Sequence, residues 1–332
     1  MAGTARGDRE VVSAKATAIA HPIQGLIKYH GLVDERLRLP FHDSISVCTA
    51  PLSTKTTVEF GEFPRDSASI NGREVAGHEL ERILAVVDIV RIRAKLHANF
   101  RMMSVNDFPS NVGLGASASG FAALAWAASA AARLPLNVKD VSRIARRGAG
   151  SASRAVAGGF ARWRTGTSDA DSFAYQLRGD DLRMGIVIAL VPAFKETESA
   201  HREAPSSPFF QARLAEMPKL LAEMELAIRN GDLGQVMQLA ERDTMLLHGI
   251  TMTGTSEMML WRPETIKVIL AVKRMREEGL PAFYSIDTGA TVYVNTFPER
   301  ADEVESRIRA LGVETLRCDV GGGARAVDEP LF

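Results

Sequence analysis

Short hydrophobic segments separated by Gly, Pro and Asp fill the first sixty residues. Segments such as ATAIAHPI, SISVCTA and KTTVEF are typical of neighbouring strands of one sheet. The dipeptide Asn71-Gly72 within SASINGREV predicts a tight hairpin turn. Between His78 and Leu96, apolar residues recur every three or four positions, and this spacing predicts an amphipathic helix.

Helices and strands are mixed through the rest of the chain. A strand is expected to end near Asn106, and the alanine-rich run from Gly113 to Ala132 indicates a packed core helix rather than a membrane span. The remaining pattern predicts helices in VKDVSRIARRG and SASRAVAGG, a buried strand in RMGIVIALVPA, three helices near 207–229, 233–247 and 263–279, and β-type segments in AFYSIDTGATVYVNT and ETLRCDVGG.

This order lacks regular strand–helix–strand alternation, and it therefore predicts an α+β fold in two lobes. The expected divisions are a flexible tail over 1–12, an N-terminal ATP-binding domain over 13–190 and a C-terminal domain over 191–332.

Composition restricts the class of protein. The 332 residues contain 40 Lys and Arg and 40 Asp and Glu, so no overall field attracts the chain to nucleic acid or anionic lipid. Cys48 and Cys318 have no metal-binding spacing, and the first dozen residues lack the apolar core of a signal peptide. We therefore expect a cytoplasmic globular protein whose partners are small molecules, without nucleic acid or membrane.

The most informative segment is PSNVGLGASASG, from Pro109 to Gly120. Glycines let the backbone approach a ligand, a helix start offers free N–H groups to an anion, and serine hydroxyls can contact phosphate or magnesium. The segment also fits a dinucleotide fingerprint loosely, lacks the lysine of a Walker loop, and is compatible with a close-packed helix start that binds nothing.

The same segment resembles the PxxxGLxSSAA phosphate loop of the GHMP kinase superfamily. That resemblance implies a two-lobed fold, with an N-terminal lobe like domain 2 of ribosomal protein S5, an α/β C-terminal lobe and an active site in the cleft between them. It also implies bound ATP and Mg²⁺, with Ser117 at phosphate and metal. The expected ATP contacts are Pro109, Ser110, Asn111, Gly113, Gly115, Ala116, Ser117, Ala118 and Ser119.

Three further segments are similar to the mevalonate diphosphate decarboxylases of that superfamily. LIKYHG with LPFHDSISV resembles IKYWGK and LPxNxSxSV, RGAGSASRAVAGGF resembles RxGSGSACRSLxGGF, and DTGAT stands in the place of DAGPN. All occur in the family's order along nearly the whole chain beyond the tail. The resemblance implies that a tertiary hydroxyl is phosphorylated by ATP and that this phosphate then leaves together with CO2.

The resemblance also implies roles for individual residues. Asp287 orients or deprotonates the hydroxyl, acting as a base or through its charge alone. Lys28 keeps Asp287 ionised and neutralises the transferred phosphoryl group. Arg154 offers a planar fork to the substrate carboxylate, and Ser151 hydrogen-bonds the same end. Further substrate contacts are expected at Tyr29, Lys195 and Arg202, although a solvated charge run fits the last two equally well.

The chain departs from the diphosphate decarboxylases at positions that bear on the substrate. Leu32 stands where the family has a second lysine, and His30 replaces a tryptophan. Ala149, Ala290 and Thr291 also differ. Because Leu32 replaces a lysine, the site has one cation fewer, which suggests a substrate with less negative charge. Strings such as AHPIQGLIKYHG and VPAFKETESAHREA are similar to phosphomevalonate decarboxylases of the modified, archaeal-type mevalonate pathway, which implies conversion of (R)-5-phosphomevalonate and ATP to isopentenyl phosphate, CO2, ADP and phosphate.

Other functions stay open at this point. They are a mevalonate diphosphate decarboxylase that makes isopentenyl diphosphate, a mevalonate 3-kinase, and a non-catalytic ATP- or metabolite-binding paralogue. The resemblance makes a homodimer the expected assembly. His21, His30 and His42 either line the cleft or are buried, hydrogen-bonded histidines, and no paired metal-ligand histidines occur.

Overall fold

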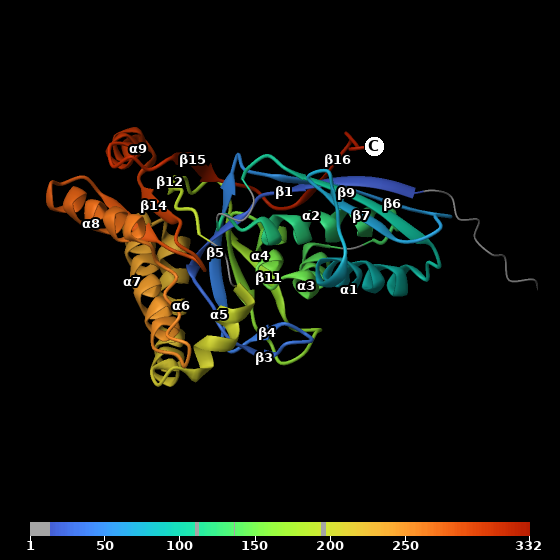
Figure 1. Cartoon of the computed structure of the whole chain (residues 1–332), viewed down its shortest axis with the longest axis horizontal. Helices are drawn as coiled ribbons and strands as arrows, with labels where there is room; N and C mark the ends of the chain where they lie inside the picture. The colour runs from blue at the N-terminus through green and yellow to red at the C-terminus, as the bar shows by residue number, and fades with distance from the viewer. Residues whose placement is uncertain (1–13, 110–112, 136, 194–196) are drawn as a thin grey trace, which may run out of the picture.

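The computed structural model describes residues 14–109, 113–135, 137–193 and 197–332 (Figure 1). The predicted tail, together with Ser110, Asn111 and Lys195, lies outside these ranges.

A six-stranded sheet forms the N-terminal lobe. Its strand order is β16 (Arg325–Val327), β1 (Ala14–Ala20), β6 (Thr54–Gly61), β9 (Asn99–Asn106), β7 (Ser67–Ile70) and β8 (Arg73–Glu74). The pairs are antiparallel except for β7 with β9. The predicted hairpin is confirmed, because Asn71 and Gly72 join β7 to β8 with φ of 50° and 78°.

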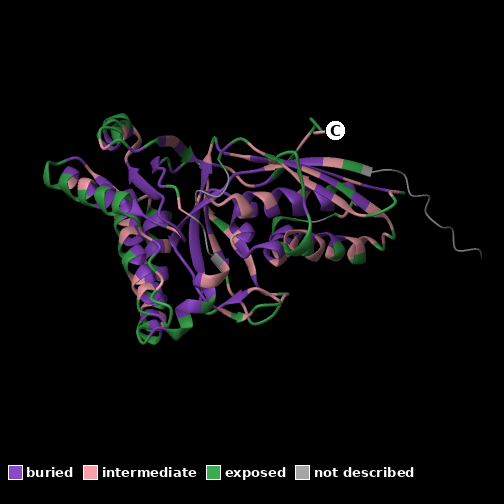
Figure 2. Ribbon diagram, in the orientation of Figure 1, coloured by how far each residue is buried: buried purple, intermediate pink, exposed green. Residues whose placement is uncertain are grey.

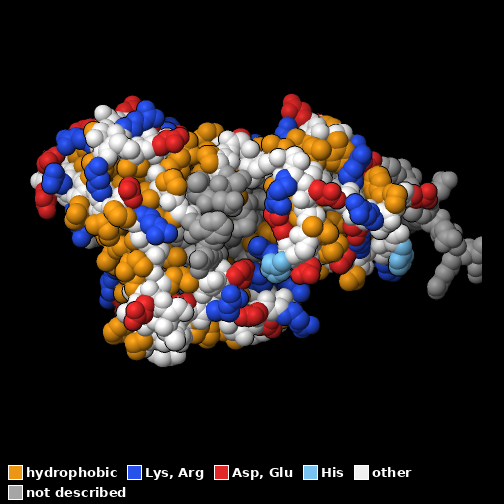
Figure 3. Space-filling model, viewed as in Figure 1, with side chains coloured by type: hydrophobic (Ala, Val, Ile, Leu, Met, Phe, Trp, Pro, Cys, Tyr) orange, Lys and Arg blue, Asp and Glu red, His pale blue; other side chains and the backbone are white. Residues whose placement is uncertain are grey.

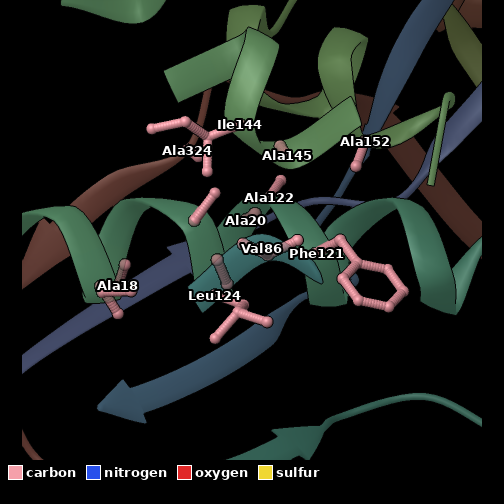
Figure 4. Close-up of a cluster of buried hydrophobic side chains, with 14 of the residues drawn as sticks. Ala18, Ala20, Val86, Phe121, Ala122, Leu124, Ile144, Ala145, Ala152 and Ala324 are labelled. Atoms are coloured by element: carbon pink, nitrogen blue, oxygen red, sulfur yellow. The ribbon is translucent and has the colours of Figure 1, made fainter. Parts of the chain in front are cut away.

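Four helices lie on one side of this sheet (Figure 1). They are α1 (Gly77–Ala94), α2 (Ala116–Ala131), α3 (Val138–Gly148) and α4 (Ala152–Ala157). The alanine-rich α2 lies against β1 and β6, and the other three helices pack against α2. Figure 4 shows the result: Ala122 and Leu124 are enclosed by Ala18 and Ala20 of the sheet and by Ile144 of α3. The small side chains of α2 allow this close approach on several sides, which confirms the predicted core helix.

An eight-stranded sheet connects the two lobes. Its order is β11 (Phe173–Arg178), β10 (Phe160–Arg164), β5 (Ser44–Ala50), β15 (Thr315–Val320), β12 (Gly185–Ala189), β14 (Val292–Thr296) and β13 (Ala282–Ser285), with β2 (Ile23–Ile27) also paired to β5. The pairs Asp319–Ala50 and Val320–Thr49 join β15 to β5. A small ribbon of β3 (Leu32–Asp34) and β4 (Leu39–Pro40) lies apart from both sheets.

Helices of the second half cover this sheet. α6 (Phe210–Asn230) and α7 (Leu233–Met252) pack against β2, α8 (Pro263–Glu277) against β13 and β14, and α9 (Ala301–Arg309) against β12 and β15. The short α5 (Thr197–Glu203) precedes them. Buried residues concentrate in α2, β5 and the inner faces of α6 and α7 (Figure 2). None of the helices within the described ranges is long and apolar enough to cross a membrane.

The strand pairing bears on the predicted domain ranges. β12 precedes residue 190 but pairs with β14 and β15, which follow it. β16, near the end of the sequence, returns to pair with β1. Each sheet therefore takes strands from both predicted ranges, and the boundary at 190 stays a prediction.

Exposed apolar side chains gather over α7 and α8, where hydrophobic surface is visible on the left of Figure 3. They include Met245, Ile266 and Leu270. The expected homodimer stays a prediction.

Gly158 lies between α4 and β10, where the backbone that follows β15 passes very close to it. Its φ is +74°, and a Cβ there would overlap the backbone of Gly322 and Gly323, which follow β15. We expect Gly158→Ala to lower the free energy of unfolding by about 2–4 kcal/mol, because backbone strain adds to overpacking. Gly312→Ala is the control, since Gly312 has φ +79° but nothing within 4 Å of a Cβ. Chemical denaturation that gave equal losses for both variants would contradict the overlap.

Candidate active site

A pocket beside β2 and the start of α2 collects most of the residues that the sequence motifs indicate. Its lining includes Lys28, Tyr29, Gly115, Ser117, Ala118, Ser151, Arg154 and Asp287. These residues come from the end of β2, the start of α2, the start of α4 and the loop after β13. Segments far apart in the sequence therefore meet at one place.

The start of α2 forms one wall. Gly115 is the N-cap residue, with φ of 75° and no capping side chain, and no acidic residue lies in the first turn. A Cβ on Gly115 would lie 3.2 Å from the carbonyl oxygen of Ile23, so the glycine lets the loop pack tightly on β2. An uncapped helix start beside Ser117 fits the phosphates of a nucleotide.

Asp287 is held against β2 by a backbone contact. The N–H of Gly25 donates to Oδ1 and Oδ2 of Asp287 at 3.0 and 3.3 Å. A Cβ on Gly25 would lie 2.8 Å from Oδ1, so a side chain at this position would displace the carboxylate. A glycine in the middle of a strand is the signal that could have indicated this close approach.

Lys28 lies next to Asp287 but has its direct contacts elsewhere. Its Nζ donates to Oγ1 of Thr244 at 3.1 Å and lies 3.6 Å from Oδ2 of Asp243. Burial lowers the pKa of Lys28 from its ordinary value, while the charges of Asp243 and, to a smaller extent, Asp287 raise it. Lys28 and Asp287 therefore interact through their charges, and the nearer carboxylate is Asp243.

Asp243 and Arg213 form a buried clamp around Lys28. Oδ2 of Asp243 accepts the backbone N–H of Lys28 at 2.9 Å. Arg213 on α6 donates to the Lys28 carbonyl and to Oδ1 of Asp243, both at 2.8 Å. The motifs did not indicate this pair. The available signal was an aspartate on the buried face of α7, four residues from both Leu239 and Leu247.

Arg154 is a buried cation facing the pocket. It is 4% exposed, and its guanidinium carbon lies 5.7 Å from the centre of the Tyr29 ring. No described residue supplies a hydrogen-bond partner to its Nε or its Nη1. Burial lowers the pKa of Arg154. A buried cation with unused donors fits an anionic ligand such as a carboxylate.

Aromatic rings close the pocket beside Arg154. Tyr29 packs edge-on against Trp163 at 4.9 Å and stacks on His201 of α5 at 5.0 Å. His30 accepts or donates a hydrogen bond through Nε2 to Oγ1 of Thr288 at 3.0 Å. Burial lowers the pKa of His30 well below its ordinary value, so the imidazole is neutral near pH 7.

The histidine predictions divide between the two interpretations. His30 lines the pocket, whereas His21 bonds to the carbonyl of Leu52 at 2.7 Å and His42 to the carbonyl of Asp43 at 2.6 Å, and neither lines it. Burial lowers the pKa of His42 to about 4. His201, which does line the pocket, was not singled out from the sequence.

Several expected contacts lie away from the pocket lining. Ser119 is fully buried, and its hydroxyl bonds to Oγ1 of Thr54 at 2.6 Å, so this side chain packs α2 against β6. Arg202 is exposed and does not line the pocket, because adjacent residues of a helix point in different directions and His201 takes the inward position. Pro109, Gly113 and Ala116 also do not line the pocket.

Within the described ranges, no group of three His, Cys, Asp or Glu side chains could hold a metal ion. Magnesium, which takes few protein ligands and several phosphate or water oxygens, fits such a site through a nucleotide and the hydroxyl of Ser117.

Comparison with known proteins decides the family. Residues 20–174 match the model of a diphosphomevalonate decarboxylase-like N-terminal domain. Over 320 residues the chain is 50% identical to the phosphomevalonate decarboxylase of Haloferax volcanii, covering 95% of this chain and 98% of that protein. The chain belongs to the mevalonate decarboxylase family.

Solved structures of the mevalonate decarboxylase family share the whole architecture. The mevalonate diphosphate decarboxylase of Staphylococcus aureus is 30% identical, with a TM-score of 0.91 over 96% of this chain and 99% of that chain. The enzyme of Enterococcus faecalis is 28% identical, with a TM-score of 0.89 over 96% and 100%. These matches confirm the predicted α+β, two-lobed GHMP kinase fold.

Proposed function

We propose that this member of the mevalonate decarboxylase family converts (R)-5-phosphomevalonate and ATP to isopentenyl phosphate, CO2, ADP and phosphate. The observation that carries the proposal is the 50% identity to a phosphomevalonate decarboxylase over almost the full length of both chains. The solved mevalonate diphosphate decarboxylases are 30% identical or less among those compared. The convergence of Asp287, Lys28 and Arg154 in one pocket supports the same reaction.

ATP is the proposed second substrate, and magnesium is the proposed cofactor. A neighbouring structure, 27% identical with a TM-score of 0.89, is a complex with MVAPP, AMPPCP and magnesium. The uncapped start of α2 at Gly115 and Ser117 supports a nucleotide phosphate site in this chain. Bound Mg-ATP would supply the phosphoryl group for the tertiary hydroxyl.

The chain's own residues position and stabilise the reacting groups. Asp287, fixed by the Gly25 N–H, orients the hydroxyl and can accept its proton. Lys28 places a cation beside Asp287, and this cation stabilises the negative charge of the phosphoryl group as it is transferred. Arg154 holds the carboxylate that leaves as CO2, with Ser151 at the same end of the pocket.

The surroundings of Leu32 support a monophosphate substrate. Leu32 packs against the apolar cluster of Tyr29 and Trp163, at the position where the diphosphate enzymes carry a lysine. A leucine in that cluster adds no cation to balance a second phosphate group. His30 and His201 line the same part of the pocket, and the neutral state of His30 also limits the positive charge there.

A substrate comparison tests the proposed function. Purified protein with Mg-ATP would be given mevalonate, 5-phosphomevalonate or 5-diphosphomevalonate, and release of ADP and CO2 would be measured. We expect CO2 mainly from 5-phosphomevalonate. A preference for the diphosphate would identify a diphosphomevalonate decarboxylase. ADP without CO2 would indicate a kinase, and no turnover of any of the three would favour a binding paralogue.

A further inference from the structure

Two adjacent residues of α7 contact both candidate catalytic segments. The carboxylate of Asp243 holds the backbone N–H of Lys28 and lies 3.6 Å from its ammonium nitrogen. The hydroxyl of Thr244 accepts a hydrogen bond from the same ammonium at 3.1 Å. It also accepts the N–H of Ile286, the residue before Asp287, at 3.2 Å.

The hydroxyl of Thr244 has no hydrogen-bonding capacity to spare. It donates to the carbonyl of Ala240 at 2.9 Å and accepts from Lys28 and Ile286. A threonine hydroxyl has one donor and two acceptor positions, and all three are therefore in use. With its rotation fixed in this way, Thr244 sets the position of the Lys28 ammonium relative to the segment that carries Asp287.

Burial makes this arrangement rigid. Asp243 and Thr244 are both fully buried, and Arg213, at 3% exposed, ties Asp243 to the Lys28 carbonyl. Removing a member of such a network leaves charged or polar groups without partners in a place that water does not reach. The clamp belongs to α6 and α7, whereas Lys28 belongs to the segment after β2, so the clamp ties that segment to the two helices.

We propose that Asp243 and Thr244 are positioning residues that hold the Lys28 ammonium beside Asp287 for the reaction. The effects of this positioning on kcat rest on the proposed function. The effects on the reactivity of the Lys28 amine do not.

The charged groups around Lys28 determine in which direction its pKa changes when Asp243 is replaced. Lys28 faces Asp243 and His248 from α7, Arg213 from α6, Asp287 from the loop after β13, and His30 of its own segment. Among these charges Asp243 contributes most to raising the pKa of Lys28, against the lowering caused by burial. Without the Asp243 charge the pKa of Lys28 falls further, and the ammonium loses its proton at a lower pH.

The first test needs no substrate. Lys28 in the unliganded protein is labelled with a trace of isotopic acetic anhydride over a range of pH, and the extent of labelling is measured by mass spectrometry. In Asp243→Asn, half-maximal labelling is expected at a pH at least one unit lower than in wild type. In Thr244→Val, which keeps the charge, the shift should be smaller. An Asp243→Asn profile that coincides with wild type would overturn the role of Asp243.

The second test is kinetic, with a control on the same helix. Glu241 bonds to Arg276 and to the N–H of Tyr284 but does not contact Lys28, so Glu241→Gln reports general loosening of α7. We expect kcat to fall at least tenfold in Asp243→Asn and Thr244→Val, with the KM for ATP changed less than threefold. Thr244→Ser should recover most of the activity, because it restores the hydroxyl. The alkaline limb of the kcat profile should move further to lower pH in Asp243→Asn than in Thr244→Val.

The outcomes separate this proposal from the proposed function. If wild type turns over none of the three mevalonate compounds, the proposed function fails, and the labelling experiment still tests the clamp. If Asp243→Asn does not fold, the activities of Thr244→Val and Thr244→Ser test whether α7 positions Lys28. A Thr244→Val enzyme as active as Glu241→Gln would overturn the role of Thr244.

Discussion

Asp287→Asn is expected to lower kcat for 5-phosphomevalonate by about 10²–10⁴-fold, the range usual for losing a positioned acid–base group. Asparagine has nearly the same shape, so its side-chain oxygen can still accept the N–H of Gly25. What it lacks is the charge and the proton-accepting oxygen. Because the nucleotide site at the start of α2 is unaltered, the affinity for ATP should change little. Steady-state kinetics and a separate ATP-binding measurement check both parts.

A surface aspartate provides the control for Asp287. Asp107 is exposed and accepts hydrogen bonds from the N–H and hydroxyl of Ser53, so Asp107→Asn removes a bonded carboxylate that does not line the pocket. Its kcat should stay close to that of wild type. Turnover of Asp287→Asn within tenfold of wild type would remove Asp287 from the mechanism.

Arg154→Met is expected to lower kcat/KM for the phosphorylated substrate by roughly 100-fold, since a charge-assisted, forked contact is worth about 3 kcal/mol. The KM for ATP should change little. The melting temperature of the unliganded protein should be no lower than that of wild type, because methionine replaces a buried cation with unused donors. Arg154→Lys should recover little activity, because an ammonium lacks the planar fork.

Another buried arginine shows what a structural role would look like. Arg146 is fully buried, donates to the carbonyl of Leu37 and pairs with Asp169 at 2.6 Å. Arg146→Met should therefore lower the melting temperature while leaving the KM of any folded enzyme unchanged. If Arg154→Met behaved like Arg146→Met, with lost stability and unaltered kinetics, the substrate contact assigned to Arg154 would be wrong.

The sequence was most informative where function depends on short local motifs. Glycines and serines between Gly113 and Gly120 indicated an uncapped helix start, and the structure has one at Gly115. Apolar periodicity located α1 and α3, and the Asn71-Gly72 dipeptide located the β7–β8 hairpin. These features depend on neighbouring residues, whose preferences can be inferred without knowing the fold.

Features that depend on distant residues were not predicted. Asp243 and Lys28 are separated by 215 positions, and nothing local to either one indicates the other. The motif-based pairing of Lys28 with Asp287 thus missed the nearer carboxylate. β10 and β11 were missed because polar residues such as Arg162 and Gln176 interrupt their apolar pattern. The inward position of His201, rather than Arg202, depends on how α5 packs over Tyr29.

The pairing of β16 with β1 has a consequence for how the chain folds during its synthesis. β1 is synthesised long before its outer partner, residues 325–327. At roughly 5–20 residues per second, this edge of β1 has no partner strand while the residues between them are made. Such an edge can recruit strands from other chains. A nascent chain of this protein should therefore depend on chaperones until residues 325–327 close the first sheet.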